Sequence, residues 1–241
     1  MELLAGKIVL QNCDRKANIT AMSGRKTEDS FTRAREKMLK RDLMGRDIID
    51  PDVLRVMGQI PREQFIPQPY RSQAYADCPI PIGLGQTISQ PYIVALMTQQ
   101  LKVNRDCEVL EIGTGSGYQS AILAKLVKKV YTIERFAALS ESAKAVLDRL
   151  GISNVEFYVG DGSCGWPEKR EFDRIIITAS VPRIPEPLIE QLKEDGLIVA
   201  PVGPADVQEL VVCEKKKGKL AQRVICGCRF VKLVGKYGFR E

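Results

Sequence analysis

The stretch of residues 108–118 constrains the fold more than any other part of the chain. Residues 109–112 are largely apolar and predict a buried strand, and three glycines at alternate positions follow. A helical pattern begins at Ser120. Strand, glycine turn and helix form the first half of a βαβ unit. Glycine lets the chain turn sharply and lets a ligand approach the backbone, where the N–H groups at the helix start can bind it.

The spacing of the glycines favours one class of ligand over another. The turn reads G-x-G-x-G, whereas a dinucleotide fingerprint reads G-x-G-x-x-G. Glu111 lies at the strand end, where it repels a pyrophosphate and can pair with an ammonium group. S-adenosylmethionine (AdoMet) has an α-amino group, a sulfonium and no phosphate, so the turn favours AdoMet; a plain glycine turn is the alternative. The turn residues assigned to AdoMet are Gly113, Thr114, Gly115, Ser116 and Gly117.

Acids also follow the next two predicted strands. Glu134 ends the strand at residues 130–134, and an acid at that tip can accept both hydroxyls of a ribose. Asp161 follows the strand at residues 155–159, where a carboxylate can accept from an adenine amino group, although an ordinary Asp-Gly turn is the alternative. The neighbouring Arg135 and Gly162 are assigned to the same ligand.

The alternation of strand and helix patterns predicts an α/β fold with a doubly wound, mostly parallel sheet, which collects these strand ends at one edge. Helices before residue 67 are expected to cover the sheet. Residues 209–214 and 221–226 predict an antiparallel hairpin around a solvated turn at residues 215–219, and residues 230–234 predict a final strand. We expect a disordered basic extension over residues 1–32 and a single domain over residues 33–241.

The charge is distributed unevenly along the chain. Residues 1–41 hold ten Lys and Arg against five Asp and Glu, whereas the rest holds 26 against 25. A nearly neutral domain argues against a surface built to neutralise many phosphates. We therefore expect no nucleic-acid partner, with the basic segment solvated. As a separate expectation, the protein is a monomer.

Cysteine and histidine usage limits the chemistry. The cysteines are seven, an odd number without a C-x-x-C pair, and we expect buried reduced thiols in a cytoplasmic protein. A metal-binding role for Cys226 and Cys228 is the alternative. The chain has no histidine, which excludes Ser-His-Asp triads and H-E-x-x-H zinc sites. We expect no metal and, without an apolar run of roughly 20 residues, no membrane span.

Residues 85–91 precede a predicted helix that begins at Pro91. Thr87 and Ser89 therefore lie beside a helix N-terminus, where anions are favoured. Helix capping alone is the alternative interpretation.

Several motifs together resemble one known family. They are residues 81–91 (PIGLGQTISQP), 109–118 (VLEIGTGSGY), 160–162 (GDG), 201–203 (PVG), 61–65 (PREQF) and 229–233 (RFVKL). From about residue 33 to residue 235 the chain resembles the protein-L-isoaspartate O-methyltransferases, a family of class I AdoMet-dependent methyltransferases.

This resemblance implies a Rossmann-like methyltransferase fold with an unusual order of the last strands. It also implies methyl transfer from AdoMet to the free α-carboxyl of L-isoaspartyl residues in damaged proteins and peptides, which initiates their repair. By this resemblance Ser89 is the active-site residue, and Thr87, Ile88 and Ser89 bind the substrate. Glu134 would hold the ribose and Asp161 would lie by the adenine.

This chemistry needs neither a base nor a metal. A carboxylate with a pKa near 4 is already ionised at pH 7, so it can attack a sulfonium directly. Holding the two reactants in line contributes on the order of 7–11 kcal/mol. Three alternatives stay open on the sequence alone: methyl transfer to RNA, another protein group or a small molecule; a non-catalytic AdoMet-binding module; and an NAD-linked oxidoreductase, which the glycine spacing disfavours.

Overall fold

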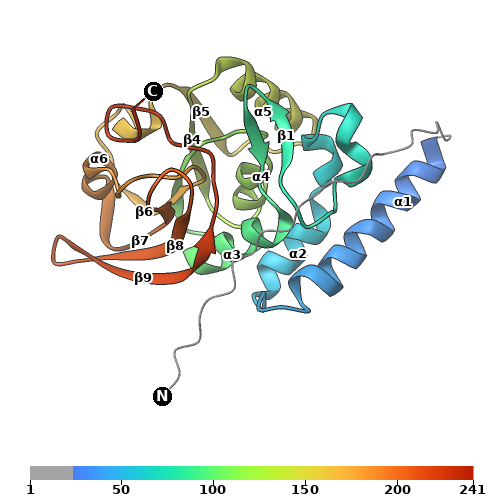
Figure 1. Ribbon diagram of the computed structural model, residues 1–241, viewed down its shortest axis with the longest axis horizontal. Coiled ribbons are helices and arrows are strands. Elements are labelled where there is room, and N and C mark those ends of the chain that lie inside the picture. Colours follow the sequence, from blue (N-terminus) through green and yellow to red (C-terminus); the bar gives the residue numbers. More distant parts are fainter. Residues whose placement is uncertain (1–23, 241) are drawn as a thin grey trace.

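The computed structural model describes residues 24–240. A seven-stranded sheet runs through the molecule with helices on both of its faces, as predicted (Figure 1). Its strands stand in the order β5-β4-β3-β6-β7-β8-β9. Their bounds are β3 (Glu108–Ile112), β4 (Lys129–Glu134), β5 (Val155–Val159), β6 (Phe172–Ile177), β7 (Leu192–Val202), β8 (Gln208–Lys216) and β9 (Lys219–Cys228).

The order of the strands reverses at β3. This strand pairs in parallel with β4, Val109 facing Val130, and in parallel with β6, Val109 facing Arg174. The chain winds outward from β3 to β5, then returns to the other side of β3 to form β6 and β7. In such sheets a crevice opens outside the carboxyl ends of the strands at the reversal, and ligands bind there.

Both faces of the sheet are buried, and alternate residues of a strand belong to the cores on opposite faces. Val109 packs with α3 (Pro91–Leu101) and α4 (Tyr118–Ala124), whereas Leu110 belongs to the core on the opposite face, with Trp166 and Leu188. The remaining helices of this part of the chain are α5 (Ala137–Arg149) and α6 (Glu186–Glu190).

The N-terminal helices lie beside the sheet, with α1 (Gly24–Lys37) on the outside (Figure 1). A π-helical turn (Met38–Leu43) continues α1, and α2 (Pro51–Gln59) follows. Asp50 caps α2, since its Oδ1 accepts from the N–H groups of Asp52 and Val53 at 2.9 and 3.1 Å. Helix α1 begins at Gly24 and so includes the last residues of the predicted extension. The first half of this helix is polar in sequence, without the apolar stripe that would indicate a helix. The rest of the predicted extension, residues 1–23, lies outside the described residues.

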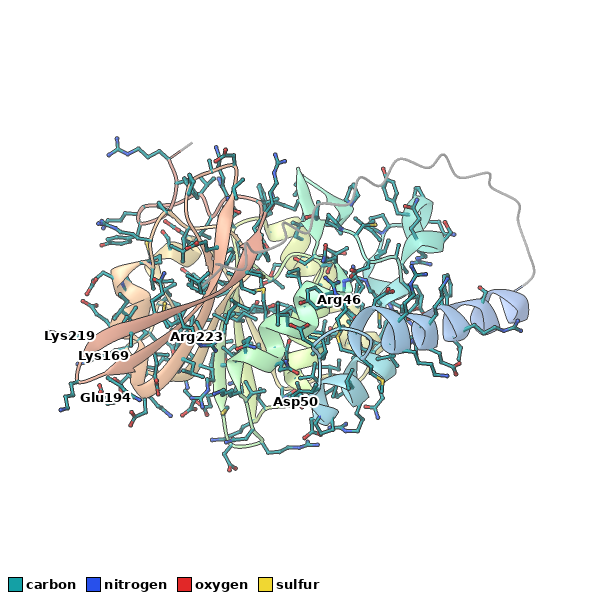
Figure 2. The ribbon with its side chains drawn as sticks, turned by 60° about the horizontal axis from the view of Figure 1, so that its bottom comes forward. Arg46, Asp50, Lys169, Glu194, Lys219 and Arg223 are labelled. Carbon is teal, nitrogen blue, oxygen red and sulfur yellow. The ribbon has the colours of Figure 1, made fainter. Side chains whose placement is uncertain are left out.

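The predicted C-terminal hairpin is formed by β8 and β9. The carboxylate of Glu194 accepts from the N–H groups of Lys217 and Gly218 and so closes the turn. Figure 2 shows Glu194 and Lys219 together at the outer end of the hairpin. The expectation of a solvated turn is wrong for Lys215, whose Nζ donates to the carbonyls of Ile189 and Leu192 at 2.8 and 2.6 Å.

The segment after β9 is not the regular strand that was predicted for residues 230–234. It is held to the loop after β6 by single bridges: Ser180 donates its N–H to the Val231 carbonyl at 2.7 Å and accepts from the Leu233 N–H at 2.8 Å. The chain then turns back, so that Val234 bridges Phe239. Residues 230–234 therefore make isolated bridges and form no strand of the sheet.

A short antiparallel hairpin, which the sequence analysis did not predict, precedes α3. Its strands are β1 (Ile80–Gly83) and β2 (Gln86–Ile88). The connecting residue Leu84 has a φ of 52°, between two glycines with φ of 99° and 70°. The G-x-G spacing was the available signal for this turn. The hairpin positions Thr87 on β2, directly before the N-terminus of α3.

Candidate active site

A pocket opens at the carboxyl ends of β3, β4 and β6, where the order of the strands reverses; we call it the donor pocket. Ten of the predicted site residues line it: Thr87, Ile88, Ser89, Gly113, Thr114, Gly115, Ser116, Glu134, Arg135 and Gly162. Three others, Glu111, Gly117 and Asp161, do not. The sheet therefore brings the glycine turn and the segment before α3 to the same cavity.

The glycine turn is closely packed against Thr178 and against Ala143 on α5. Gly113 has a φ of 98°, and a Cβ on it would lie 2.5 Å from the hydroxyl oxygen of Thr178. That hydroxyl is bonded to the carbonyls of Ile112 and Gly113 at 2.9 and 2.6 Å. Gly117 has a φ of 84°, and its Cβ would lie 2.9 Å from the Cβ of Ala143 on α5. Both positions thus require glycine, for backbone conformation and for space.

Glu134 is buried at the end of β4 beneath the glycine turn. Its Oε2 accepts from the N–H of Gly115 at 2.8 Å, and its Oε1 accepts from the N–H of Phe136 at 3.1 Å. Each carboxylate oxygen can accept a further hydrogen bond. The side chain therefore fixes the turn and keeps free acceptor sites facing the donor pocket, as a ribose-binding acid requires.

Glu111 lies deeper than the sequence suggested. It is wholly buried, and its Oε2 accepts from the hydroxyls of Ser120 on α4 and Thr132 on β4, the latter at 2.8 Å. Burial, with a smaller contribution from the nearby Glu134, raises its pKa to about 7 against the effect of these two hydrogen bonds. Because the side chain does not line the pocket, the predicted direct pairing with an ammonium group finds no support in this geometry.

Asp161 is engaged by the segment after β9. Its Oδ1 accepts from the N–H and hydroxyl of Ser163 at 2.9 and 2.7 Å, and its Oδ2 accepts from the N–H of Lys236 at 2.7 Å. Burial opposes ionisation, but the hydrogen bonds from Lys236 and Ser163 outweigh it and lower the pKa of Asp161. Asp161 lines a neighbouring pocket with Arg135, beside the donor pocket, and its adenine contact stays a prediction.

A second pocket, which we call the acceptor pocket, adjoins the donor pocket. The two share one wall, made of Thr87, Ser89, Thr178, Val231 and Lys232. Gln90, Arg229 and Phe230 also line the acceptor pocket, and none of its described lining residues carries a carboxylate. Two cationic side chains and several polar groups thus face a cavity without fixed negative charge, which suits an anionic acceptor.

Arg62 is a functional candidate that the sequence analysis quoted only within a family motif. Its guanidinium is wholly buried and donates to the carbonyls of Ala74 and Ser89, both at 2.7 Å. It also lies over the ring of Tyr118, 4.7 Å from the centroid. Arg62 thereby fastens the backbone of Ser89 to the residue that follows the glycine turn. No local pattern reveals this role, because the three contacts come from distant parts of the chain.

The N-terminus of α3 is already occupied by a carboxylate of the chain itself. Asp77 Oδ1 accepts from the N–H of Tyr92 at 3.2 Å, while its Oδ2 is paired with Arg46 at 2.9 Å. Burial raises the pKa of Asp77, and the Tyr92 N–H and Arg46 oppose that rise. An acceptor beside Ser89 therefore depends on side-chain donors more than on the exposed helix end that the sequence suggested.

The described cysteines form no disulfide bond, and three of them, Cys78, Cys107 and Cys213, are buried as expected. Cys164 is exposed, contrary to that expectation, and Cys13 lies outside the described residues. Cys228 lines the acceptor pocket, and burial raises its pKa to about 12. Since only a thiolate is strongly nucleophilic, this thiol does not compete with a carboxylate for a methyl group.

Within residues 24–240, no cluster of three or more Cys, Asp or Glu side chains is arranged to hold a metal ion. No helix in that part of the chain is both long and apolar enough to cross a membrane.

The reversal of the strands at β3, the glycine turn at that point and the antiparallel pair at the sheet edge define a Rossmann-like methyltransferase. The comparisons with known proteins identify the family. The model of the protein-L-isoaspartate(D-aspartate) O-methyltransferase family matches residues 33–238. The chain belongs to this family, which confirms the resemblance and the fold predicted from the sequence.

Curated relatives match over nearly their whole length. A protein-L-isoaspartate O-methyltransferase of Desulfosudis oleivorans is 49% identical over 214 residues, covering 89% of this chain and 97% of the relative. One from Methanoregula boonei is 51% identical over 207 residues, covering 86% of this chain and 95% of the relative.

Solved structures agree. A protein-L-isoaspartate O-methyltransferase aligns with a TM-score of 0.76 at 31% identity, covering 85% of this chain and 67% of the other. A Plasmodium falciparum structure is described as such a methyltransferase in complex with S-adenosyl-L-homocysteine. It aligns with a TM-score of 0.73 at 26% identity, covering 85% of this chain and 98% of the other.

Proposed function

We propose that this protein transfers a methyl group from AdoMet to the free α-carboxylate of L-isoaspartyl residues in damaged proteins and peptides, and so initiates their repair. The observation that carries the proposal is the wall shared by the donor and acceptor pockets, which is formed in part by Thr87 and Ser89. Membership of the family supports the same activity.

The donor pocket fits AdoMet in shape and in chemistry. Gly113 and Gly117 set the left-handed backbone of the turn, since side chains there would collide with Thr178 and Ala143. Glu134 keeps acceptor capacity for a ribose diol. AdoMet supplies an electrophilic methyl group on a sulfonium. The protein's part is to bind it with the methyl group directed at the shared wall.

The acceptor pocket fits a carboxylate. The side-chain nitrogen of Gln90 is buried there and has no hydrogen-bond partner within residues 24–240. A buried donor without a partner is costly, and an anion would satisfy it. The hydroxyls of Thr87 and Ser89 can donate to the same anion without protonating it. Arg229 and Lys232 add favourable charge.

The reaction then needs no proton transfer, because the attacking carboxylate is ionised at neutral pH. Arg62 holds the backbone of Ser89, and Thr178 holds the glycine turn, so the two binding sites keep a fixed relation. Alignment of the reactants contributes on the order of 7–11 kcal/mol to such a step.

The test uses two peptides that differ only in Asp versus isoAsp at one position. With methyl-labelled AdoMet, label should enter the isoaspartyl peptide as a base-labile ester, and the aspartyl peptide should stay unlabelled. Equal labelling of both peptides would refute the assignment of the acceptor. AdoMet binding without transfer to either would favour the non-catalytic module.

The expected monomer, cytoplasmic location and absence of nucleic-acid or membrane partners stay proposals, as does the division at residues 32 and 33. The free thiols of the described cysteines support a reducing compartment, and the charge balance of residues 42–241 supports the absence of nucleic acid. Light scattering tests the monomer, and titration with nucleic acid in low salt tests the absence of a nucleic-acid partner.

A further inference from the structure

Two buried hydroxyl groups connect the Glu111 carboxylate to the donor pocket. Thr132 Oγ1 lies 2.8 Å from Glu111 Oε2, and Thr114 Oγ1 lies 2.7 Å from Thr132 Oγ1. Thr132 is wholly buried in β4, whereas Thr114 lines the pocket. The three side chains thus form a continuous hydrogen-bonded chain from the core to the pocket wall.

The carboxylate fixes the direction of every bond in this chain. An ionised carboxyl group can only accept, so Thr132 must donate its single hydroxyl hydrogen to Glu111. Thr132 can then only accept from Thr114, which gives up its own hydrogen. The Thr114 hydroxyl oxygen then has only lone pairs to offer to a ligand in the pocket. The uncharged side chain of Thr114 therefore acts only as a hydrogen-bond acceptor.

We propose that Glu111 is a positioning residue that acts through Thr132 to fix Thr114 as a hydrogen-bond acceptor for the ammonium group of the methyl donor. This inference rests on the proposed function in one respect, that AdoMet is the ligand. It replaces the direct contact between Glu111 and the ammonium group with one transmitted by two hydroxyls. It also gives the negative charge of Glu111 a use, since a buried charge favours a cation nearby.

The arrangement makes donor binding depend on pH. Burial raises the pKa of Glu111 to about 7, so its protonation changes in the neutral range. On α4 its neighbour is the neutral Ser120, and on β4 the carboxylate of Glu134 contributes to the raised pKa of Glu111. Protonated Glu111 can donate as well as accept, so the direction of the chain is no longer fixed. Affinity for the ammonium group then falls as the pH falls through this value.

The experiment compares two ligands by calorimetry: AdoMet, and 5′-methylthioadenosine, which has the same nucleoside but lacks the aminocarboxypropyl group, with its ammonium and carboxylate, and the sulfonium charge. Thr132→Val removes the linking hydroxyl at nearly constant volume, and Thr132→Ser restores it. Thr132→Val should weaken AdoMet about tenfold, the effect of one lost hydrogen bond, and leave methylthioadenosine within about twofold. Thr132→Ser should bind both ligands like the wild type.

Glu111→Gln keeps an acceptor at the same position but cannot titrate. Between about pH 7.5 and pH 6, the preference of the wild type for AdoMet over methylthioadenosine should fall several-fold, and that of Glu111→Gln should stay constant. The comparison also removes the titration of the ligand's own amino group, which both proteins share.

Three results would overturn the inference. One is equal weakening of both ligands by Thr132→Val, which indicates only a packing role. Another is an unchanged AdoMet affinity in that variant. The third is a pH dependence in Glu111→Gln equal to that of the wild type. Failure of the wild type to bind either ligand would instead count against the proposed function, so the two failures can be told apart.

Discussion

The two halves of the site are built in different ways. The donor half comes from consecutive strand ends, and its residues lie within about one βαβ unit of one another: the glycine turn after β3, and Glu134 at the end of β4. The acceptor half joins β2 and Gln90 to the segment after β9, from the other end of the domain. One half is a property of a local motif, whereas the other exists only after the chain has folded.

This difference predicts separate consequences for mutations. Changes in the donor half should alter the affinity for AdoMet and leave the apparent affinity for peptide unchanged. Changes in the acceptor half should alter the apparent affinity for peptide and leave the affinity for AdoMet unchanged. Substitutions at positions that hold the two halves together should alter both the affinity for AdoMet and the apparent affinity for peptide. Three of the four predictions below test this separation and the last tests the burial of Glu111; they run from the largest expected effect to the smallest.

Gly113→Ala should be the most damaging. The new Cβ would lie 2.5 Å from the Thr178 hydroxyl oxygen, in a backbone conformation with φ of 98°. We expect a loss of about 2–4 kcal/mol in the free energy of unfolding and a loss of AdoMet binding of more than about a hundredfold. Urea titration and calorimetry measure the two effects. Gly218→Ala is the matched control, because it has a φ of 73° but no neighbour within 4 Å; equal losses in both variants would contradict the packing argument.

Glu134→Ala should weaken AdoMet by roughly thirtyfold, or about 2 kcal/mol, because it removes charged hydrogen bonds to the ribose and to the Gly115 N–H. The KM for an isoaspartyl peptide, measured at saturating AdoMet, should change less than about twofold. Calorimetry and steady-state kinetics provide the two numbers. An unchanged Kd for AdoMet would remove Glu134 from the donor site.

Ser89→Ala should show the opposite pattern. Loss of one hydroxyl donor to the acceptor should lower kcat/KM for the peptide about tenfold while the Kd for AdoMet stays within about twofold. The backbone tie from Arg62 to the Ser89 carbonyl is retained in this variant, so the loop keeps its position. A collapse of AdoMet binding would mean that Ser89 holds the donor half instead.

The smallest effect concerns stability. The pKa of Glu111 rises on folding from 4.5 to about 7, so the folded protein binds more protons than the unfolded chain between these values. The contribution of this group to the free energy of unfolding therefore falls as the pH rises through that window, by about 1 kcal/mol per unit near pH 6. Urea titrations of wild type and Glu111→Gln should differ by this slope, and identical slopes would show that Glu111 does not titrate there.

The sequence revealed the donor half because periodicity and glycine spacing are local signals. The strands, the sheet edge and most of the turn residues followed from them. Burial could not be judged in the same way. Glu111 looked like a pocket acid, yet its side chain enters the core on the α4 side, because alternate residues of β3 face opposite ways.

The acceptor half could be predicted only through the resemblance. The cap that Asp77 provides to α3, the tie from Arg62 to Ser89 and the hold of the Lys236 N–H on Asp161 join residues with no common local pattern. The predicted strand at residues 230–234 failed for the same reason. Its apolar residues pack against the loop after β6 without joining the ladder of the sheet.

The most direct test of the central claim is a crystal structure with S-adenosyl-L-homocysteine and an isoaspartyl peptide bound together. The account predicts the nucleoside over Glu134 and the glycine turn, the peptide carboxylate beside Ser89 and Gln90, and space for one methyl group between the ligand's sulfur and that carboxylate. A ligand lodged away from the carboxyl ends of β3 and β4, or a carboxylate too far from the sulfur for a methyl group to pass between them, would contradict it.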